Sequence, residues 1–110
     1  MMIEPIAPHS MVIVNLVNPK EKFWGMLVSL SSVGLTLHGI NLDSFEDWIR
    51  QVAGSQEQNL DLVTMFVPLF RVERMFLDQP VGVVMSYSDQ FRQIVGLTPE
   101  EFLGVAKLDA

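Results

Sequence analysis

Three apolar runs separated by short polar breaks lie between Met11 and Ile40, and this spacing constrains the fold more than any other feature. The runs cover residues 11–17, 22–31 and 33–40 and are rich in β-branched and aromatic residues, which favours strands. The break at 18–21 reads Asn-Pro-Lys-Glu, a composition typical of a turn. Gly25, inside the second run, indicates a bend or the close approach of another backbone. We therefore predict a tightly bent, three-stranded antiparallel unit.

The hydrophobic period changes after residue 43. Apolar residues in 44–54 recur at helical spacing, which predicts an amphipathic helix with this stripe: Phe45, Trp48, Ile49 and Val52. Two further strands are predicted at 62–67 and 70–77. Ser86 is placed to cap a second helix that Gly96 ends. The run Thr-Pro-Glu-Glu from Thr98 has the form of a capping box and starts a last helix over residues 99–106.

The chain has 110 residues, the length of one domain. Residues 1–10, with two prolines, are predicted to form a flexible tail. Residues 11–79 are predicted to form a β-barrel with the inserted helix at 44–54, and residues 80–110 a helical segment packed on that barrel.

The run from Val12 to Leu30 resembles the first motif of the Sm-like family, in which alternating apolar residues lead through a polar turn to a glycine. The matching positions are Val12, Val14, Leu16, Gly25, Leu27 and Leu30. Residues 66–75 are similar to the strand-bend-strand that closes such barrels. The resemblance implies a small antiparallel SH3-like or Sm-like barrel of about five strands. The family's N-terminal helix is absent, and a helix is predicted after strand three instead. With the helices predicted at the C-terminal end, the expected fold class is α+β.

The sequence departs from the Sm-like pattern at the positions that contact RNA in that family. Ser31, Ser32, Val33 and Gly34 occupy the turn where the family has an acidic residue and an asparagine, and the basic-glycine pair of the closing strands is missing. The net charge is −6, with 7 Lys and Arg against 13 Asp and Glu. Because phosphate backbones are bound by clustered cations, nucleic-acid binding is disfavoured.

The composition of the chain excludes several kinds of functional site. The chain has no cysteine, which excludes disulfides and thiolate sites and fits a cytoplasmic location. No run approaches the roughly 20 apolar residues of a membrane-spanning helix. No nucleophile has a base at a recognisable spacing, so we predict no enzyme, no catalytic or metal site and no cofactor. The carboxylates Asp43, Glu46 and Asp47 could bind a cation, but capping of the predicted helix is the favoured interpretation.

Six residues are candidates for contact with a partner or ligand. Arg71, Glu73 and Arg74 form one charged set, in which Arg71 either grips an anion or, as we favour, forms a cross-strand ion pair. On an extended strand Arg71 and Glu73 share one face and Arg74 lies on the other. Three residues complete the set of candidates: Trp24, Trp48 and His38. For the tryptophans, core packing is favoured over a partner surface, and for His38 an ordinary hydrogen-bonded role is favoured over catalysis.

The predicted strands are apolar on much of both faces, and only 18% of the residues are charged. A dimer or ring would bury this surplus. The leading hypothesis is therefore a self-associating, non-enzymatic module that binds a protein partner. The alternatives are a diverged Sm-like RNA-binding protein and an anion or small-ligand sensor that uses Arg71. The sequence identifies neither the partner nor the number of subunits.

Overall fold

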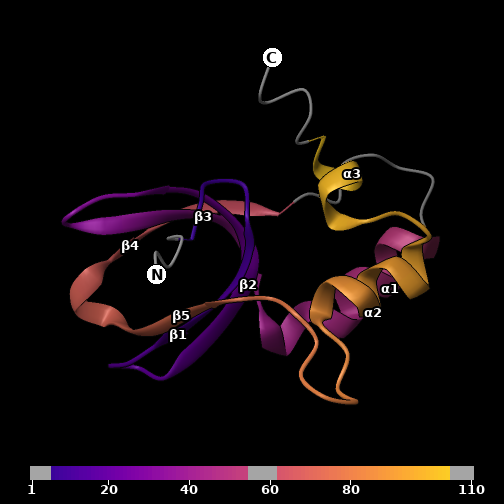
Figure 1. Ribbon diagram of the computed structural model, residues 1–110, viewed down its shortest axis with the longest axis horizontal. Helices are drawn as coiled ribbons and strands as arrows, with labels where there is room; N and C mark the ends of the chain where they lie inside the picture. Colours follow the sequence, from indigo (N-terminus) through magenta and orange to yellow (C-terminus); the bar gives the residue numbers. More distant parts are fainter. Residues whose placement is uncertain (1–5, 55–61, 105–110) are drawn as a thin grey trace, which may run out of the picture.

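The computed structural model describes residues 6–54 and 62–104, which form an α+β domain. A five-stranded antiparallel sheet occupies one half of the molecule, and the helices occupy the other half (Figure 1). The strands are β1 (Met11–Leu16), β2 (Glu21–Leu30), β3 (Gly34–Asn41), β4 (Val63–Pro68) and β5 (Val72–Leu77). The helices are α1 (Phe45–Gly54), α2 (Tyr87–Val95) and α3 (Pro99–Leu103), with the 3-10 turns η1 (Leu42–Ser44) and η2 (Leu69–Arg71).

The strand order β4-β3-β2-β1-β5 places β4 and β5 at the two edges of the sheet. Among the described residues β4 and β5 are not paired with each other, so the sheet is open. The predicted three-stranded unit is confirmed, because β2 pairs antiparallel with both β1 and β3. Gly25 faces Gly39 on β3, and a Cβ atom added at Gly25 would overlap the Gly39 Cα and the His38 carbonyl. The close backbone approach expected at Gly25 is therefore confirmed.

Both faces of the sheet are buried, but different parts of the chain bury them. The curved strands enclose one core between themselves, formed by Val12, Val14, Leu16, Leu27, Leu35, Leu37 and Val67. The other face packs against the helices in a second core, formed by Met11, Ile13, Trp24, Met26, Phe45, Trp48, Ile49, Leu62 and Phe91. Figure 1 shows α1 and α2 on one side of the strands, against this second face. The apolar character of both faces of β1 and of the middle of β2, Trp24–Leu27, is thus explained within one chain.

The helices begin and end near the predicted residues. In α1 the predicted stripe faces the core, with Phe45, Trp48 and Ile49 buried. Ser86 caps α2 by accepting a hydrogen bond from the Asp89 amide, and the helix ends at Gly96, which has a φ of 90°. A glycine adopts this left-handed conformation without steric penalty.

The capping box at the start of α3 is confirmed. The Thr98 side chain accepts from the Glu101 amide, and the Glu101 side chain accepts from the Thr98 amide. This helix ends at Leu103, before the predicted end at 106, because Gly104 takes a φ of 68°. Residues 105 and 106 lie outside the described residues.

The prediction for the closing strand was wrong at its start. Residues 69–71 form the turn η2, and β5 begins only at Val72. Arg71 is therefore not on an extended strand, and it does not share a strand face with Glu73. Pro68, which has a φ of −65° and precedes the turn, offers no amide hydrogen to continue a ladder.

Two local features were not anticipated. A β-bulge between Leu27 and Ser29 shifts the register of β2 against β3. Within the predicted tail, the His9 amide donates to the Leu27 carbonyl and the Leu27 amide donates to the Ser10 carbonyl. Packing onto the sheet therefore begins before Met11. Residues 1–5 of that tail lie outside the described residues.

Candidate interaction surfaces

Trp24 and Trp48 lie in the core between the sheet and the helices. Their ring centroids are 6.0 Å apart, and both rings stack on Phe91 of α2. The Trp24 Nε1 donates to the Asp78 carboxylate at 2.8 Å, and that carboxylate also accepts from the backbone amides of Tyr87 and Ser88. The two tryptophans therefore hold helices against strands, as the favoured interpretation expected, and neither forms an exposed partner surface.

Arg71 binds the turn between β1 and β2. Its guanidinium forms an ion pair with Glu21 at 3.0 Å and donates to the carbonyls of Val17 and Pro19 at 3.1 and 2.8 Å. An ion pair was favoured over an anion grip, but the pair joins η2 to the first residue of β2 and is not the cross-strand pair that was predicted. The side chain is 25% exposed, and three protein acceptors already use its donors.

Arg74 has a different environment from Arg71. Its side chain is 66% exposed and lies 3.4 Å from the carboxylate of its neighbour Glu73. On the sheet, Asn15 lies opposite both Arg74 on β5 and Lys22 on β2. Cross-strand partners share a face of the sheet, so Lys22, Asn15 and Arg74 form one polar row. Charged neighbours from the β1–β2 turn, η2 and β5 lie at the same end of the sheet. The four cations there are Lys20, Lys22, Arg71 and Arg74, and the two carboxylates are Glu21 and Glu73.

His38 is half-buried on β3, and its Nδ1 lies 2.8 Å from the Thr64 hydroxyl on β4. The pair fixes the ring beside its neighbouring strand. The structure thus separates the six candidate residues: the tryptophans lie in the core, Arg71 and His38 are engaged by other strands or turns, and Glu73 with Arg74 lies at an edge.

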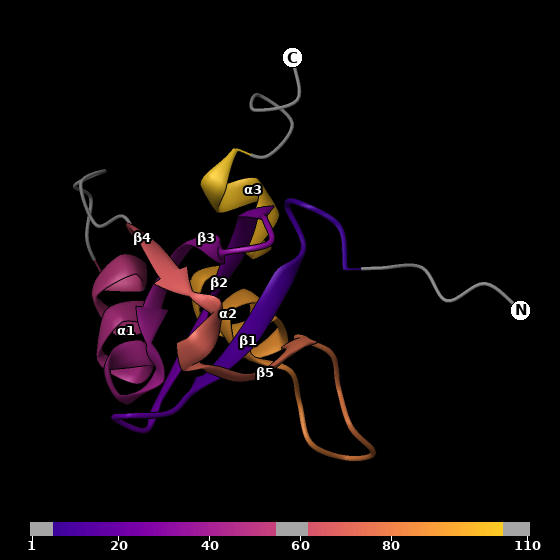
Figure 2. The same ribbon diagram turned by 90° about the vertical axis from the view of Figure 1, so that its left-hand side faces the viewer.

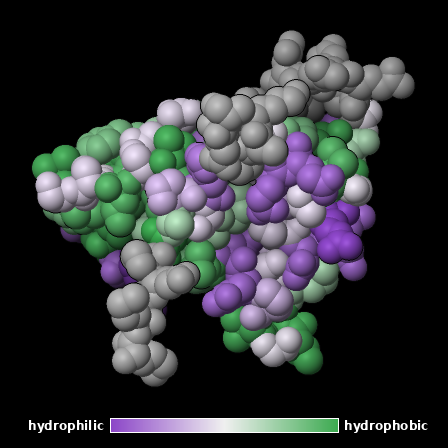
Figure 3. Space-filling view, turned by 45° about the horizontal axis from the view of Figure 1, so that its top comes forward, coloured by the Kyte–Doolittle hydropathy of each residue, from purple (hydrophilic) through white to green (hydrophobic). Residues whose placement is uncertain are grey.

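A patch of exposed apolar side chains lies where the β2–β3 turn meets β4 and η2. We call it the end patch, and it consists of Leu30, Val33, Phe66, Leu69 and Phe70. These residues come from the end of β2, the β2–β3 turn, β4 and η2. The Leu69 amide joins η2 to the turn by donating to the Val33 carbonyl. Phe70 is 82% exposed. In Figure 3 hydrophobic residues gather at the end of the molecule where the β2–β3 turn and η2 lie.

A second exposed apolar feature is the hairpin between β5 and α2. Val81 and Val84 exchange two backbone hydrogen bonds of 3.0 and 2.9 Å, and Gly82 between them has a φ of 58°. Val83 at the tip is fully exposed. The hairpin projects away from both the sheet and the helices (Figure 2).

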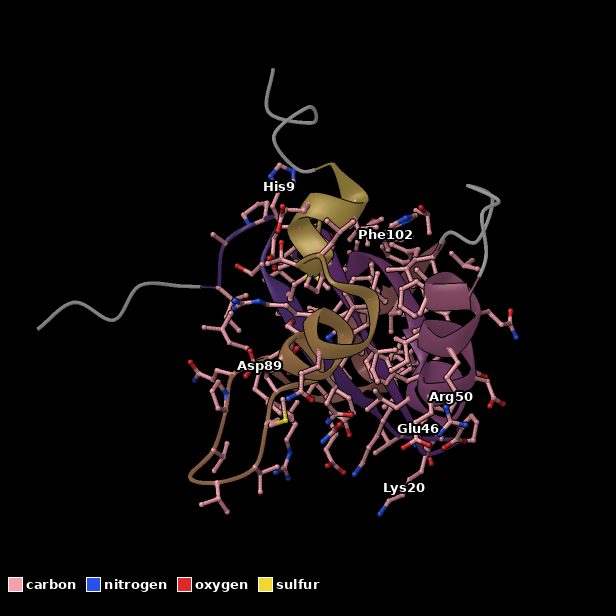
Figure 4. All side chains as sticks on the ribbon, turned by 90° about the vertical axis from the view of Figure 1, so that its right-hand side faces the viewer. His9, Lys20, Glu46, Arg50, Asp89 and Phe102 are labelled. Carbon is pink, nitrogen blue, oxygen red and sulfur yellow. The ribbon has the colours of Figure 1, made fainter. Side chains whose placement is uncertain are left out.

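Within the described residues, no three His, Asp or Glu side chains are grouped as metal ligands would be. A groove between α1 and α2 is lined by Glu46, Ile49, Arg50, Gln90, Gln93 and Ile94. Figure 4 shows Glu46 and Arg50 together on the outside of α1, and their side chains pair at 3.9 Å. No helix in the described part of the chain has the length and apolar character needed to cross a membrane.

Sequence reasoning did not identify the end patch or the hairpin. A signal for the end patch was present, because residues 23–42 and 62–70 contain no Asp, Glu, Lys or Arg. Most of these residues were predicted to form strands, and the alternation of a strand does not show which of its ends is left uncovered.

Comparison with known proteins adds no family to this description. No protein-family model matches the sequence, and no curated protein or solved structure matches it either. The interpretation of the surfaces therefore depends on the geometry described above.

Proposed function

We propose that this chain is a non-enzymatic protein-interaction module that self-associates through the end patch. The proposal includes the Sm-like or SH3-like barrel as the underlying fold. The strand order β4-β3-β2-β1-β5 and the short turn η2 between β4 and β5 support that assignment. A cytoplasmic location, expected from the cysteine-free sequence, is part of the same proposal.

The end patch carries the proposal. Soluble monomers rarely expose a contiguous apolar patch of more than a few hundred Å², and larger patches mark sites of association. Here two phenylalanines and three aliphatic residues are exposed together on elements held by ordered backbone hydrogen bonds. Aromatic side chains at the centre of an interface contribute a large part of the binding free energy.

The absence of charge from the end patch favours a second copy of the same chain as its partner. In a two-fold symmetric contact each residue near the axis faces its own copy, so like charges would repel. The segments 23–42 and 62–70 carry no charged side chain, whereas the whole chain carries −6. The end patch therefore lies in the uncharged part of a chain whose copies repel each other elsewhere.

Sedimentation velocity over a range of protein concentrations tests this proposal. We expect the mass to rise with concentration for the natural chain and to remain that of a monomer for Phe70→Ser. Val83→Ser is the matched control, because Val83 is also apolar and exposed but lies on the hairpin. A monomer at all concentrations, or equal dissociation by both substitutions, would contradict the proposal.

The same samples distinguish the alternative functions. RNA binding would appear as an affinity for single strands that falls with salt, with a slope of about −0.7 for each phosphate contact. Anion sensing through Arg71 has less support, because Glu21 and two carbonyls already bind its guanidinium.

A further inference from the structure

The edge strand β5 points to the chemistry of a partner, and this inference depends on the proposed function as a protein-interaction module. Among the described residues β5 pairs with β1 and with no other strand. All six of its residues are exposed or half-buried. An unpaired edge presents a row of backbone N–H and C=O groups, to which an extended peptide can add as a further strand.

The register shows which side chains such a peptide would meet. One row across the sheet contains Lys22, Asn15 and ends in Arg74. The neighbouring row contains Trp24, Ile13 and ends in Phe76, which is 43% exposed. Arg74 and Phe76 are two residues apart on one strand and therefore point to the same face.

The charge around Arg74 indicates which charge the partner segment carries. The end of the sheet around Arg74 has four cations and two carboxylates, a net charge of +2 on a chain whose total is −6. A carboxylate in the partner would be attracted to this end, whereas a cation would be repelled. The other open edge of a second copy does not fit, because β4, Val63–Pro68, contains no carboxylate.

We propose that β5 binds an extended segment of a partner protein as a sixth strand of the sheet. The segment carries an Asp or Glu beside Arg74 and an apolar residue beside Phe76, so the two lie two positions apart in its sequence. Glu73 competes with the partner carboxylate, because its own carboxylate lies 3.4 Å from the Arg74 guanidinium. The surface differs from the end patch in its residues: Arg74 and Phe76 lie on β5, whereas Phe70 of the end patch lies on η2, which precedes β5.

The probe is a blocked peptide of sequence Thr-Val-Thr-Glu-Thr-Leu-Thr-Val, titrated into the ¹⁵N-labelled chain and followed by amide chemical shifts. We expect the largest changes at Val72–Leu77. A peptide with Lys in place of Glu should bind about fivefold more weakly, the size of effect that an exposed ion pair produces. A peptide with proline at the central threonine should not bind, because proline removes a ladder donor.

Charge exchange provides the decisive variants. Arg74→Glu should reverse the preference, so that the Lys peptide binds more tightly than the Glu peptide. Glu73→Gln should strengthen binding of the Glu peptide about twofold by releasing Arg74. Arg50→Glu is the matched control: it makes the same charge change at an exposed position on α1 and should leave both affinities unchanged.

Several results would overturn the proposal. One is that no peptide changes the amide chemical shifts at concentrations up to millimolar. Another is that the changes centre on β4 instead of β5. A third is that Arg50→Glu and Arg74→Glu weaken binding of the Glu peptide equally. Sedimentation of the same variants separates this proposal from self-association. Arg74→Glu should leave the mass unchanged, and Phe70→Ser should leave peptide binding unchanged.

Discussion

The base and the tip of the β2–β3 hairpin have similar sequences but different surroundings. At the base, Trp24 is fully buried because α1 and α2 pack over it. At the tip, Leu30 and Val33 are 52% and 68% exposed, and none of the described helices covers them. The β-bulge after Leu27 lies between the two regions and changes the pairing of β2 with β3.

This difference shows that an apolar strand pattern indicates burial without identifying what does the burying. At the base, helices of the same chain bury the second face of the sheet. At the tip the same kind of residue remains exposed and available to another molecule. The many apolar residues of the strands suggested self-association. Some of them are buried by the helices of the same chain, and the others remain exposed.

The largest expected effect is at the base. Trp24→Ala should lower the free energy of unfolding by about 3–5 kcal/mol, because it opens a cavity between the sheet and the helices. Leu30→Ala should lower it by less than about 0.5 kcal/mol, since that side chain is exposed. Urea denaturation at a concentration where the chain is monomeric measures both. Similar losses would show that the tip is covered within the monomer.

The base could be predicted because its determinants are local. The alternation of β1 to β3, the stripe of α1 and the caps at Ser86 and Thr98 are all set by neighbouring residues. Each of these features depends on backbone geometry or periodicity that a short sequence window contains.

The surfaces could not be predicted in the same way because they depend on contacts distant in sequence. Arg71 meets Glu21 across 50 positions, and Trp24 meets Asp78 across 54. Exposure of Phe70 depends on η2, which replaced the expected start of a strand. Only the assembled sheet brings Arg74 and Phe76 to an open edge.

A smaller effect is expected where two backbones meet at the base. Gly25→Ala should lower the free energy of unfolding by about 1–3 kcal/mol, because the added Cβ would overlap the backbone of β3 and the two strands would have to separate. Gly54→Ala is the control, since a Cβ there has open space and alanine favours a helix. We expect it to be neutral or slightly stabilising in the same thermal or urea measurement. A tolerated Gly25→Ala would mean that β2 and β3 do not approach closely there.

The smallest effect extends the comparison from apolar to charged residues. Arg71 and Arg74 are three positions apart, yet three acceptors of the chain bind Arg71, whereas Arg74 is 66% exposed and pairs with its neighbour Glu73. Arg71→Met should lower the free energy of unfolding by about 1–2 kcal/mol, and Arg74→Met by less than about 0.5 kcal/mol. Arg74→Met is the matched control for loss of one positive charge.

Salt distinguishes the contributions to the Arg71 effect. At about 1 M NaCl the Debye length falls to about 3 Å, which screens the attraction between Arg71 and Glu21 but leaves hydrogen bonds to the Val17 and Pro19 carbonyls intact. Most of the loss in Arg71→Met should therefore persist at high salt, whereas any loss in Arg74→Met should disappear. If salt abolished both losses, Arg71 would act only as a surface charge. Arg71 and Arg74 would then not differ in the way that the buried base and the exposed tip of the β2–β3 hairpin do.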